Sequence, residues 1–270
     1  MDFTDDQLQR YARHIVLPEV GGIGQEKLLN ARVLVIGAGG LGAPLLLYLA
    51  AAGIGTLGVV DDDAVDLSNL QRQVIHGTGD IGTPKVASAA ASVGAVNPEI
   101  DFRTHHMRMD AANILDIFDG YDIVADGSDN FATRFLVNDA CHLAGKTLVS
   151  GSILRFEGQI STFKSHQGPD FPCYRCLYSE APPAGLVPSC SEGGVFGALA
   201  GVVGSLQAVE VLKEAMGIGE TLAGRLMLYD ALGAEFRTIR IKRDPGCALC
   251  GDSPTITDLA RHLHAEPELA

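Results

Sequence analysis

The sequence predicts an α/β protein in which a parallel sheet in the N-terminal half is continued by antiparallel strands in the C-terminal half. Short apolar segments alternate with helical segments in the first 150 residues, which is typical of parallel βαβ units. We expect the parallel strands at residues 33–36, 56–60, 100–103, 121–125 and 147–150. Two further β-prone runs, 152–155 and 158–163, are close enough in sequence to form a hairpin.

A glycine-rich turn after the first strand makes this prediction of the fold more specific. Gly37, Gly39 and Gly42 match the pattern G-x-G-x-x-G between a strand and a helix expected over about 41–52. Asp61 ends the next strand, where an acid usually binds ribose hydroxyls. These features indicate a Rossmann-like, doubly wound sheet with an anion-binding helix N-terminus, and taken alone they favour a dinucleotide such as NAD. The alternative is a strand–helix turn without a ligand.

Composition excludes several classes of partner and location. The 270 residues include 33 acidic and 20 basic side chains, for a net charge of −13. That balance argues against nucleic acid or an anionic membrane as a partner, since both select basic patches. Neither a leader-like start nor an uninterrupted apolar run of ~20 residues is present, so we expect a cytoplasmic protein without a membrane span.

Three cations of the N-terminal half are candidates for binding phosphate. Arg13 belongs to a polar helix expected over 5–13, and Arg72 is the cation of an acidic and then amide-rich segment, 61–73. Lys85 follows Pro84 at the expected start of a helix, where the helix dipole disfavours a cation unless an anion binds there. The alternative for Arg13 and Lys85 is an ordinary surface position.

Polar residues also follow the strand at 121–125. Asp126 and Asp129 stand at its carboxyl end, the edge where parallel sheets bind ligands. Mg²⁺ binds one or two carboxylates together with phosphate oxygens, which makes such an acid a candidate magnesium ligand. Either residue is equally suited to cap the helix expected over 131–144.

The cysteines predict a metal site. Cys173-x-x-Cys176 and Cys247-x-x-Cys250 are two thiolate pairs flanked by proline or glycine. Four thiolates suit tetrahedral Zn²⁺ with no open position, hence a structural zinc, with disulfides or an iron–sulfur cluster as alternatives. Of the remaining two, Cys141 is expected to pack inside a helix. Cys190 precedes a buried helix expected over 194–216, where a thiol is either reactive or an inert loop residue.

The C-terminal part holds two more expected strands, 225–229 and 235–241, and a tail, 251–270, with a possible short helix at 256–264. We found no repeat and no flexible linker, so we expect a single domain. Its nucleotide-binding half would be residues 1–150, its carrier-binding and zinc half 151–250, and its tail 251–270.

As the ligand, a triphosphate is favoured over a dinucleotide by four residues taken together: Arg13, Arg72, Lys85 and Asp129. An NAD(P)-dependent oxidoreductase explains the glycines and Asp61 but needs neither three cations nor a metal-binding carboxylate. Nucleotidyl or phosphoryl transfer uses all of them, and a zinc-stabilised binding module without catalysis is a further alternative.

The chain resembles the E1-like adenylating enzymes, and within them the sulfur-carrier adenylyltransferases of the MoeB, ThiF and HesA type. The similarity runs from about Arg10 to Cys250 and is slightly better to the molybdopterin-synthase branch. The motifs that carry it include GAGGLG at 37–42, LSNLQRQ at 67–73, GTPK at 82–85, DGSDN at 126–130, both C-x-x-C pairs, GSLQAVE at 204–210 and YDA at 229–231.

The resemblance implies an ATP-dependent adenylation of a small ubiquitin-like sulfur carrier that ends in Gly-Gly, in molybdopterin or thiamine biosynthesis. It implies Mg²⁺ on Asp129, Zn²⁺ on the four paired cysteines, and a homodimer in which Arg13 reaches the partner subunit's triphosphate. It further implies a possible sulfur or thioester step at Cys190, supplied by a cysteine desulfurase or another sulfur donor. The ATP-binding residues it implies are Gly40, Asp61, Ser68, Asn69, Arg72, Gln73, Lys85, Asp129 and Asn130.

Overall fold

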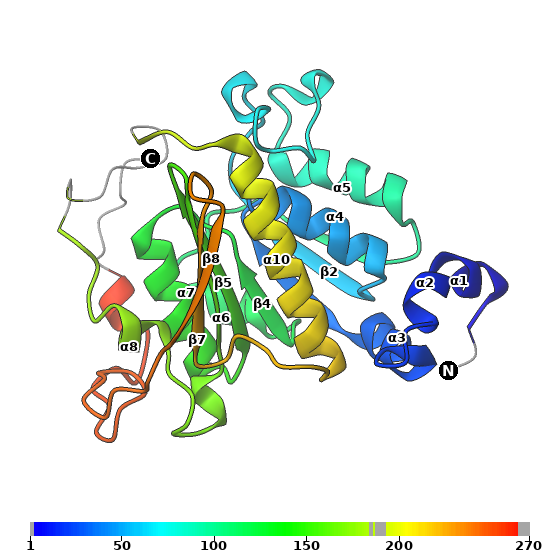
Figure 1. The fold of residues 1–270 in the computed structure, drawn as a ribbon. Helices are drawn as coiled ribbons and strands as arrows, with labels where there is room; N and C mark the ends of the chain where they lie inside the picture. The colour runs from blue at the N-terminus through cyan, green and yellow to red at the C-terminus, as the bar shows by residue number, and fades with distance from the viewer. Residues whose placement is uncertain (1–2, 184–185, 187–192, 264–270) are drawn as a thin grey trace.

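One eight-stranded sheet runs through the computed structural model, which describes residues 3–183, 186 and 193–263 (Figure 1). The strand order is β3-β2-β1-β4-β5-β6-β7-β8. Their bounds are β1 Arg32–Ile36, β2 Thr56–Val60, β3 Asp101–His105, β4 Ile123–Asp126, β5 Thr147–Leu154, β6 Glu157–Phe163, β7 Arg225–Asp230 and β8 Glu235–Arg240. The predicted change from parallel to antiparallel pairing is confirmed and occurs at β5.

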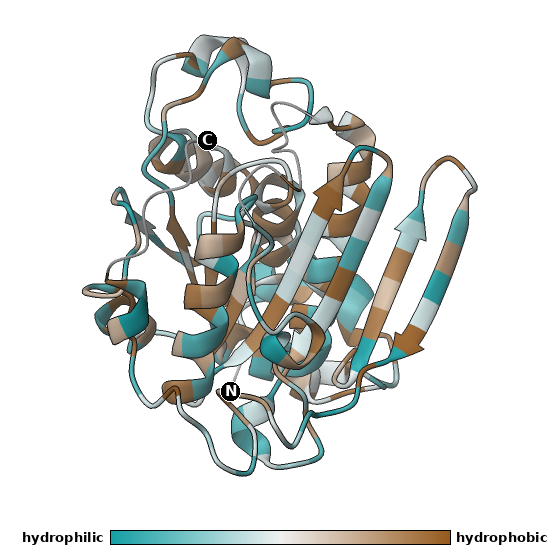
Figure 2. Cartoon of the chain, turned by 90° about the vertical axis from the view of Figure 1, so that its left-hand side faces the viewer, coloured by the Kyte–Doolittle hydropathy of each residue, from teal (hydrophilic) through white to brown (hydrophobic). Residues whose placement is uncertain are grey.

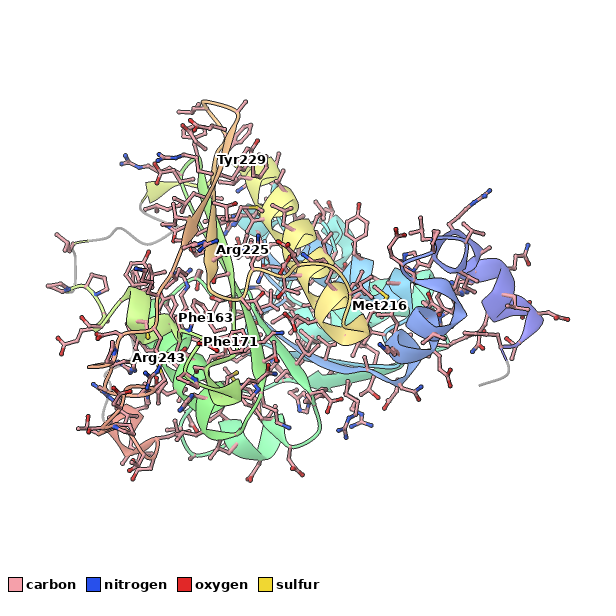
Figure 3. The ribbon with its side chains drawn as sticks, turned by 60° about the horizontal axis from the view of Figure 1, so that its bottom comes forward. Phe163, Phe171, Met216, Arg225, Tyr229 and Arg243 are labelled. Atoms are coloured by element: carbon pink, nitrogen blue, oxygen red, sulfur yellow. The ribbon has the colours of Figure 1, made fainter. Side chains whose placement is uncertain are left out.

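Helices cover both faces of this sheet. Their bounds are α1 Asp5–Arg10, α2 Ala12–Ile15, α3 Gly21–Asn30, α4 Gly42–Ala52, α5 Lys85–Val96, α6 Ile114–Phe118, α7 Phe131–Leu143, α8 Tyr174–Leu177 and α10 Gly197–Met216. Figure 1 shows α4, α5 and α10 on one face and α6 and α7 on the other. The end of α10 lies beside the N-terminal helices, as the position of Met216 shows (Figure 3).

The parallel half is doubly wound, as the βαβ pattern predicts. β1 pairs in parallel with β2 on one side and β4 on the other, so the strand order reverses next to β1. Successive residues of a strand point to opposite faces. Val33 and Val35 therefore enter the core beneath α4 and α5, whereas Leu34 and Ile36 enter the core beneath α6 and α7. This two-sided burial explains the uninterrupted apolar sequence of β1.

The antiparallel half departs from the prediction in one respect. Residues 147–150 and 152–155 were expected as separate strands, but β5 is continuous over Thr147–Leu154. Its first four residues pair in parallel with β4, and the strand also pairs antiparallel with β6 from Leu148 onward. β7 and β8 extend the sheet, and Figure 2 shows hydrophobic and hydrophilic residues alternating along the strands at this edge.

Several helix boundaries also differ from prediction. The polar helix expected over 5–13 is divided at Tyr11 into α1 and α2. The glycines at 21–24, a residue type with low helix propensity, lie in the first turns of α3. In the tail, the described part contains a single 3-10 turn, Ala260–His262, in place of the helix expected at 256–264. Within the described residues no helix combines the length and apolarity needed to cross a membrane.

Candidate functional site

The glycine turn has the geometry that its sequence predicts. Gly37 adopts a φ of +86°, a left-handed conformation that side chains disfavour. At Gly42 a Cβ atom would lie 1.9 Å from the carbonyl oxygen of Gly37, so a side chain cannot fit between α4 and the turn. Gly42 thus allows the helix to pack on the strand, while Gly37, Gly39 and Gly40 line the adjoining cleft.

A cleft of about 730 Å³ lies at the carboxyl ends of the parallel strands. It is lined by predicted site residues from three separate segments: the glycine turn, the stretch after β2, and the stretch after β4. These residues are Gly37, Gly39, Gly40, Asp61, Arg72, Gln73, Lys85, Asp129 and Asn130. The fold therefore brings together the candidates for binding nucleotide phosphates, sugar and metal.

Asp61 is held by backbone N–H groups on two sides. Its carboxylate accepts hydrogen bonds from the N–H of Ala38, at 2.8 Å, and from the N–H of Asp63, at 2.9 Å. Burial raises the pKa of Asp61, while the nearby Lys85 and these N–H groups oppose the rise. The acid is thus fixed against the glycine turn at the position expected for a ribose contact.

Lys85 is a buried cation at the start of α5. Its side chain is 7% exposed, and its Nζ forms an ion pair with Asp63 Oδ2 at 2.7 Å. Asp63 itself is 67% exposed, so the pair stands at the cleft wall with the lysine inside. The anion beside Lys85 in this structure is the Asp63 carboxylate, and the predicted contact of Lys85 with a bound anion stays a prediction. Pro84, expected as the first helical residue, is the N-cap.

Arg72 and Gln73 approach the cleft from the other side of the glycine turn. Arg72 Nη1 donates to the carbonyl of Ser68 at 3.1 Å, and its side chain packs against Gly40. Gln73 is 4% exposed, and its Oε1 is buried without a hydrogen-bond partner. Ser68 and Asn69 belong to the short turn that carries Arg72 and do not line the cleft themselves.

The polar residues at and just after the end of β4 lie in different environments. Asn130 is the N-cap of α7, accepting from the N–H of Thr133 at 2.8 Å, so neither Asp126 nor Asp129 caps this helix. Asp126 is fully buried, which raises its pKa, and one of its oxygens has no partner. Asp129 is exposed in the cleft and is therefore free to bind an ion.

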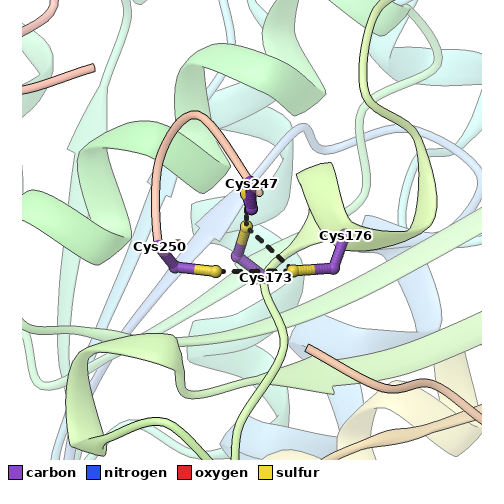
Figure 4. Close-up of side chains that lie close together, drawn as sticks. All are labelled: Cys173, Cys176, Cys247 and Cys250. Carbon is purple, nitrogen blue, oxygen red and sulfur yellow. Dashed lines mark hydrogen bonds between the residues drawn. The ribbon is translucent and has the colours of Figure 1, made fainter. Parts of the chain in front are cut away.

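The two C-x-x-C pairs meet in a single cluster (Figure 4). Sulfur–sulfur distances are 4.0 Å for Cys173 and Cys176, 3.6 Å for Cys173 and Cys247, and 3.4 Å for Cys176 and Cys250. A tetrahedral zinc ion bound at about 2.3 Å from each sulfur separates the sulfurs by roughly 3.8 Å. The four thiols are therefore spaced for one metal ion such as zinc and too far apart for disulfides.

Of the predicted catalytic residues, one lies away from this cleft and one is not described by the structure. Arg13 is exposed on α2 and does not line the cleft. Cys190 lies outside the described residues, so its predicted role stays a prediction.

The sequence analysis missed other cleft residues, including Asp63, Arg134, Ile153 and His262. Asp63 was detectable as part of the acidic run that begins at Asp61. The others carry no local signal, because tertiary packing brings them to the cleft.

Comparison with known proteins identifies the family. The ThiF family model matches residues 11–249. The chain belongs to the ThiF family.

Curated relatives within this family are named as adenylyltransferases. A sulfur carrier protein adenylyltransferase of Thermus thermophilus is 51% identical over 261 residues, which cover 96% of each protein. A probable adenylyltransferase/sulfurtransferase MoeZ of Mycobacterium tuberculosis is 56% identical over 256 residues. That match covers 94% of this chain but 64% of MoeZ, so the chain spans less than two thirds of this longer relative. A SAMP-activating enzyme E1 of Haloferax volcanii is 51% identical over 246 residues, 91% of this chain and 90% of that protein.

Solved structures support the same fold. E. coli MccB with ATP matches with a TM-score of 0.75 at 18% identity, over 92% of this chain and 82% of that one. MccB with AMPCPP and MccA matches with a TM-score of 0.77 at 22% identity, over 93% and 75%. At these identities the likeness concerns the fold of the ThiF-family domain alone.

Proposed function

We propose that this ThiF-family chain adenylates the C-terminal Gly-Gly carboxylate of a small ubiquitin-like sulfur carrier, using ATP. The observation that carries the proposal is the convergence of the glycine turn, Arg72, Lys85 and Asp129 on one cleft. The names of its relatives support the reaction class and the kind of acceptor. The carrier would be of the MoaD or ThiS type, serving molybdopterin or thiamine biosynthesis in the cytoplasm.

The chemistry requires positioning and charge neutralisation. The carrier's terminal carboxylate is ionised at neutral pH and needs no general base. It attacks the α-phosphorus of ATP, the bond to the bridging oxygen breaks, and pyrophosphate leaves with the bonding electrons. Arg72 and Lys85 stabilise the charge that develops on the phosphate oxygens, a contribution of about 2–4 kcal/mol for a single well-placed donor. The carboxyl-adenylate is then ready for a separate sulfur donor, such as a cysteine desulfurase, with Cys190 as a candidate transfer residue.

Asp129 is the residue best placed to bind Mg²⁺. Three other carboxylates, those of Asp61, Asp62 and Asp63, lie within 4.8 Å of one another. Asp61 already accepts two backbone N–H groups and Asp63 is paired with Lys85, whereas Asp129 is exposed in the cleft. When bound there, Mg²⁺ would neutralise phosphate charge.

A homodimer would bring Arg13 to the partner subunit's cleft. Arg13 is exposed, and the helices around it leave several large apolar side chains uncovered. These are Leu8, Val16, Leu17 and Ile23, which are 45%, 69%, 47% and 75% exposed. Large apolar side chains exposed on neighbouring helices suit an interface, and a second copy of the chain is the occupant that would make Arg13 functional.

The carrier would dock on an apolar surface next to the cleft. Phe156, Phe196 and Phe236 are 38%, 53% and 52% exposed, and Phe236 stacks on Tyr229 of β7. Tyr229 is labelled in Figure 3. Phe156 follows β5, and Ile153 of that strand lines the cleft. A carrier bound over these rings would therefore have a short path for its flexible C-terminal tail into the cleft.

The proposal is tested by incubating the chain with ATP, Mg²⁺ and candidate Gly-Gly carriers. We expect the carrier to gain the mass of AMP and the enzyme to catalyse carrier-dependent ATP–pyrophosphate exchange. Asp129→Ala and Arg72→Ala should each abolish exchange in a folded protein. The alternative, an NAD(P)-dependent oxidoreductase, predicts instead that NAD raises the melting temperature and that ATP–Mg²⁺ does not.

A further inference from the structure

A buried histidine lies directly behind the glycine turn. His76 is 7% exposed, and its Nε2 lies 2.9 Å from the carbonyl oxygen of Ala38, in the middle of that turn. Its Nδ1 lies 2.8 Å from the hydroxyl of Ser88 on α5. Neither His76 nor Ser88 lines the cleft, and the chemistry proposed above does not use them.

The hydrogen bonds around this ring determine where its protons lie. A carbonyl oxygen can only accept, so Nε2 carries a proton and donates it to Ala38. Burial lowers the pKa of His76, and the nearby Lys85 lowers it further, whereas the hydrogen bond to Ala38 and the carboxylates of Asp61 and Asp80 oppose the change. The ring is therefore neutral, and its Nδ1 is an acceptor. The remaining donor is the Ser88 hydroxyl.

The Ser88 hydroxyl has two possible acceptors and one proton. Besides Nδ1, it lies 2.9 Å from Oδ2 of Asp80, which also accepts from the N–H of Gly77 at 2.7 Å. A carboxylate can only accept, so the Ser88 hydroxyl donates to Asp80, and it shares this proton with Nδ1 in a three-centre hydrogen bond. The shared proton gives Nδ1 a donor and, together with the Ala38 carbonyl, holds the ring in one orientation as the Nε2–H tautomer.

This arrangement holds the glycine turn on both sides of Ala38. The N–H of Ala38 donates to Asp61 at 2.8 Å, and its carbonyl accepts from His76. The next two residues, Gly39 and Gly40, line the cleft. We propose that His76, oriented by Ser88, is a positioning residue that keeps the glycine turn in the conformation that binds nucleotide phosphate. This inference rests on the nucleotide binding of the proposed function.

Two substitutions at His76 separate the hydrogen bond from the volume of the ring. His76→Phe retains a ring but has no donor for Ala38, whereas His76→Gln retains an N–H donor. We expect the Phe variant of the full-length chain to bind ATP–Mg²⁺ about 10-fold more weakly in calorimetric titration, the effect of losing one buried hydrogen bond. The Gln variant should stay within about 3-fold of the wild type, because it can still donate to the carbonyl.

Ser88→Ala tests the orientation of the ring, with Ser92→Ala as its matched control. Ser92 lies one turn further along α5 and donates to the carbonyl of Ile75 at 2.6 Å, so it holds the backbone next to His76 but not the His76 ring. Nitrogen NMR of the ligand-free protein should show His76 as the Nε2–H tautomer in the wild type and in Ser92→Ala. In Ser88→Ala the Nδ1 signal should shift, because this nitrogen has lost its donor, and ATP binding should weaken in that variant alone.

The outcomes distinguish this inference from the proposed function. If the wild type binds ATP and a folded His76→Phe binds it equally well, the positioning role is refuted. If the Phe variant fails to fold, an unchanged Nδ1 signal and unchanged ATP affinity in Ser88→Ala refute it instead. If the wild type does not bind ATP, the proposed function fails and the positioning role fails with it, whatever the tautomer.

Discussion

If Lys85 binds nucleotide phosphate as proposed, it must exchange one anion for another, and this exchange can be measured. In this structure its partner is Asp63, at 2.7 Å. A phosphate that recruits Lys85 has to compete with this carboxylate. Replacing Asp63 by alanine removes the competing carboxylate, so Lys85 becomes available to phosphate. Before phosphate binds, however, Lys85 has lost its ion-pair partner, and this loss destabilises the fold.

The magnitude follows from the exposure of the two partners. Fully exposed ion pairs contribute about 0.2–1 kcal/mol, and removing one partner from a fully buried pair costs about 3–5 kcal/mol. Here Lys85 is 7% exposed and Asp63 is 67% exposed, so an intermediate loss of about 1–2 kcal/mol is expected in the ligand-free protein. Because bound phosphate restores a partner, much of that loss returns on binding, and ATP affinity should rise about 5- to 10-fold.

Chemical unfolding without nucleotide and calorimetric titration with ATP, with and without Mg²⁺, measure the two effects. Asp62→Ala is the charge-matched control, since Asp62 is exposed and forms no ion pair within the described chain. The reasoning is refuted if Asp63→Ala and Asp62→Ala unfold alike and bind ATP with equal affinity. A decrease in affinity confined to titrations with Mg²⁺ would instead assign Asp63 to metal binding.

Three further predictions concern the metal, the dimer and the buried acid of β4. Cys247→Ala should lose zinc, as elemental analysis will show. It should also melt at least several degrees lower, since 1 kcal/mol corresponds to about 2–4 °C in a chain near this size. A zinc-free variant of full stability would contradict a structural role for the metal. Inactive Arg13→Ala and Asp129→Ala chains, once mixed and shown by mass to exchange subunits, should regain up to about half of the wild-type activity per heterodimer, and no recovery would exclude action across the interface. Asp126 has a raised pKa in the fold, so the wild type loses stability as pH rises from about 4 through that pKa; Asp126→Asn should avoid this loss, and its melting temperature should increasingly exceed that of the wild type between pH 4 and pH 7.

The glycine turn and the four cysteines were predictable because their constraints are local. Gly37 needs a left-handed backbone, Gly42 needs the absence of a side chain, and each C-x-x-C pair places two sulfurs near each other. Each of these requirements can be recognised from residues that lie a few positions apart in the sequence. The partner of Lys85 is a different case, because it lies 22 residues away and depends on how the intervening loop folds.

The errors in element boundaries have a common physical cause. The glycines at 21–24 have low helix propensity, yet Gly24 lies in α3 because the helix packs closely against Met216 there. Gly151 was expected to interrupt β5, but the strand continues through it. Asp126, Asp129 and Asn130 are all suitable N-caps by type, and the geometry of α7 selects Asn130. In each case tertiary packing decided between alternatives that the local sequence left open.

Helix α10 joins the two halves of the chain through glycine contacts. A Cβ at Gly204 would lie 2.3 Å from the carbonyl oxygen of Leu41, the residue before α4, so α10 packs directly on the end of the glycine turn. One turn along, Gln207 fills the space above Gly151 and donates to the backbone carbonyl of Asp126 at 2.8 Å. The same helix therefore fixes the glycine turn and the end of β4, the two sides of the cleft. Since Phe196 is the N-cap of α10, a carrier bound at the proposed docking surface would contact the helix that packs against both sides of the cleft.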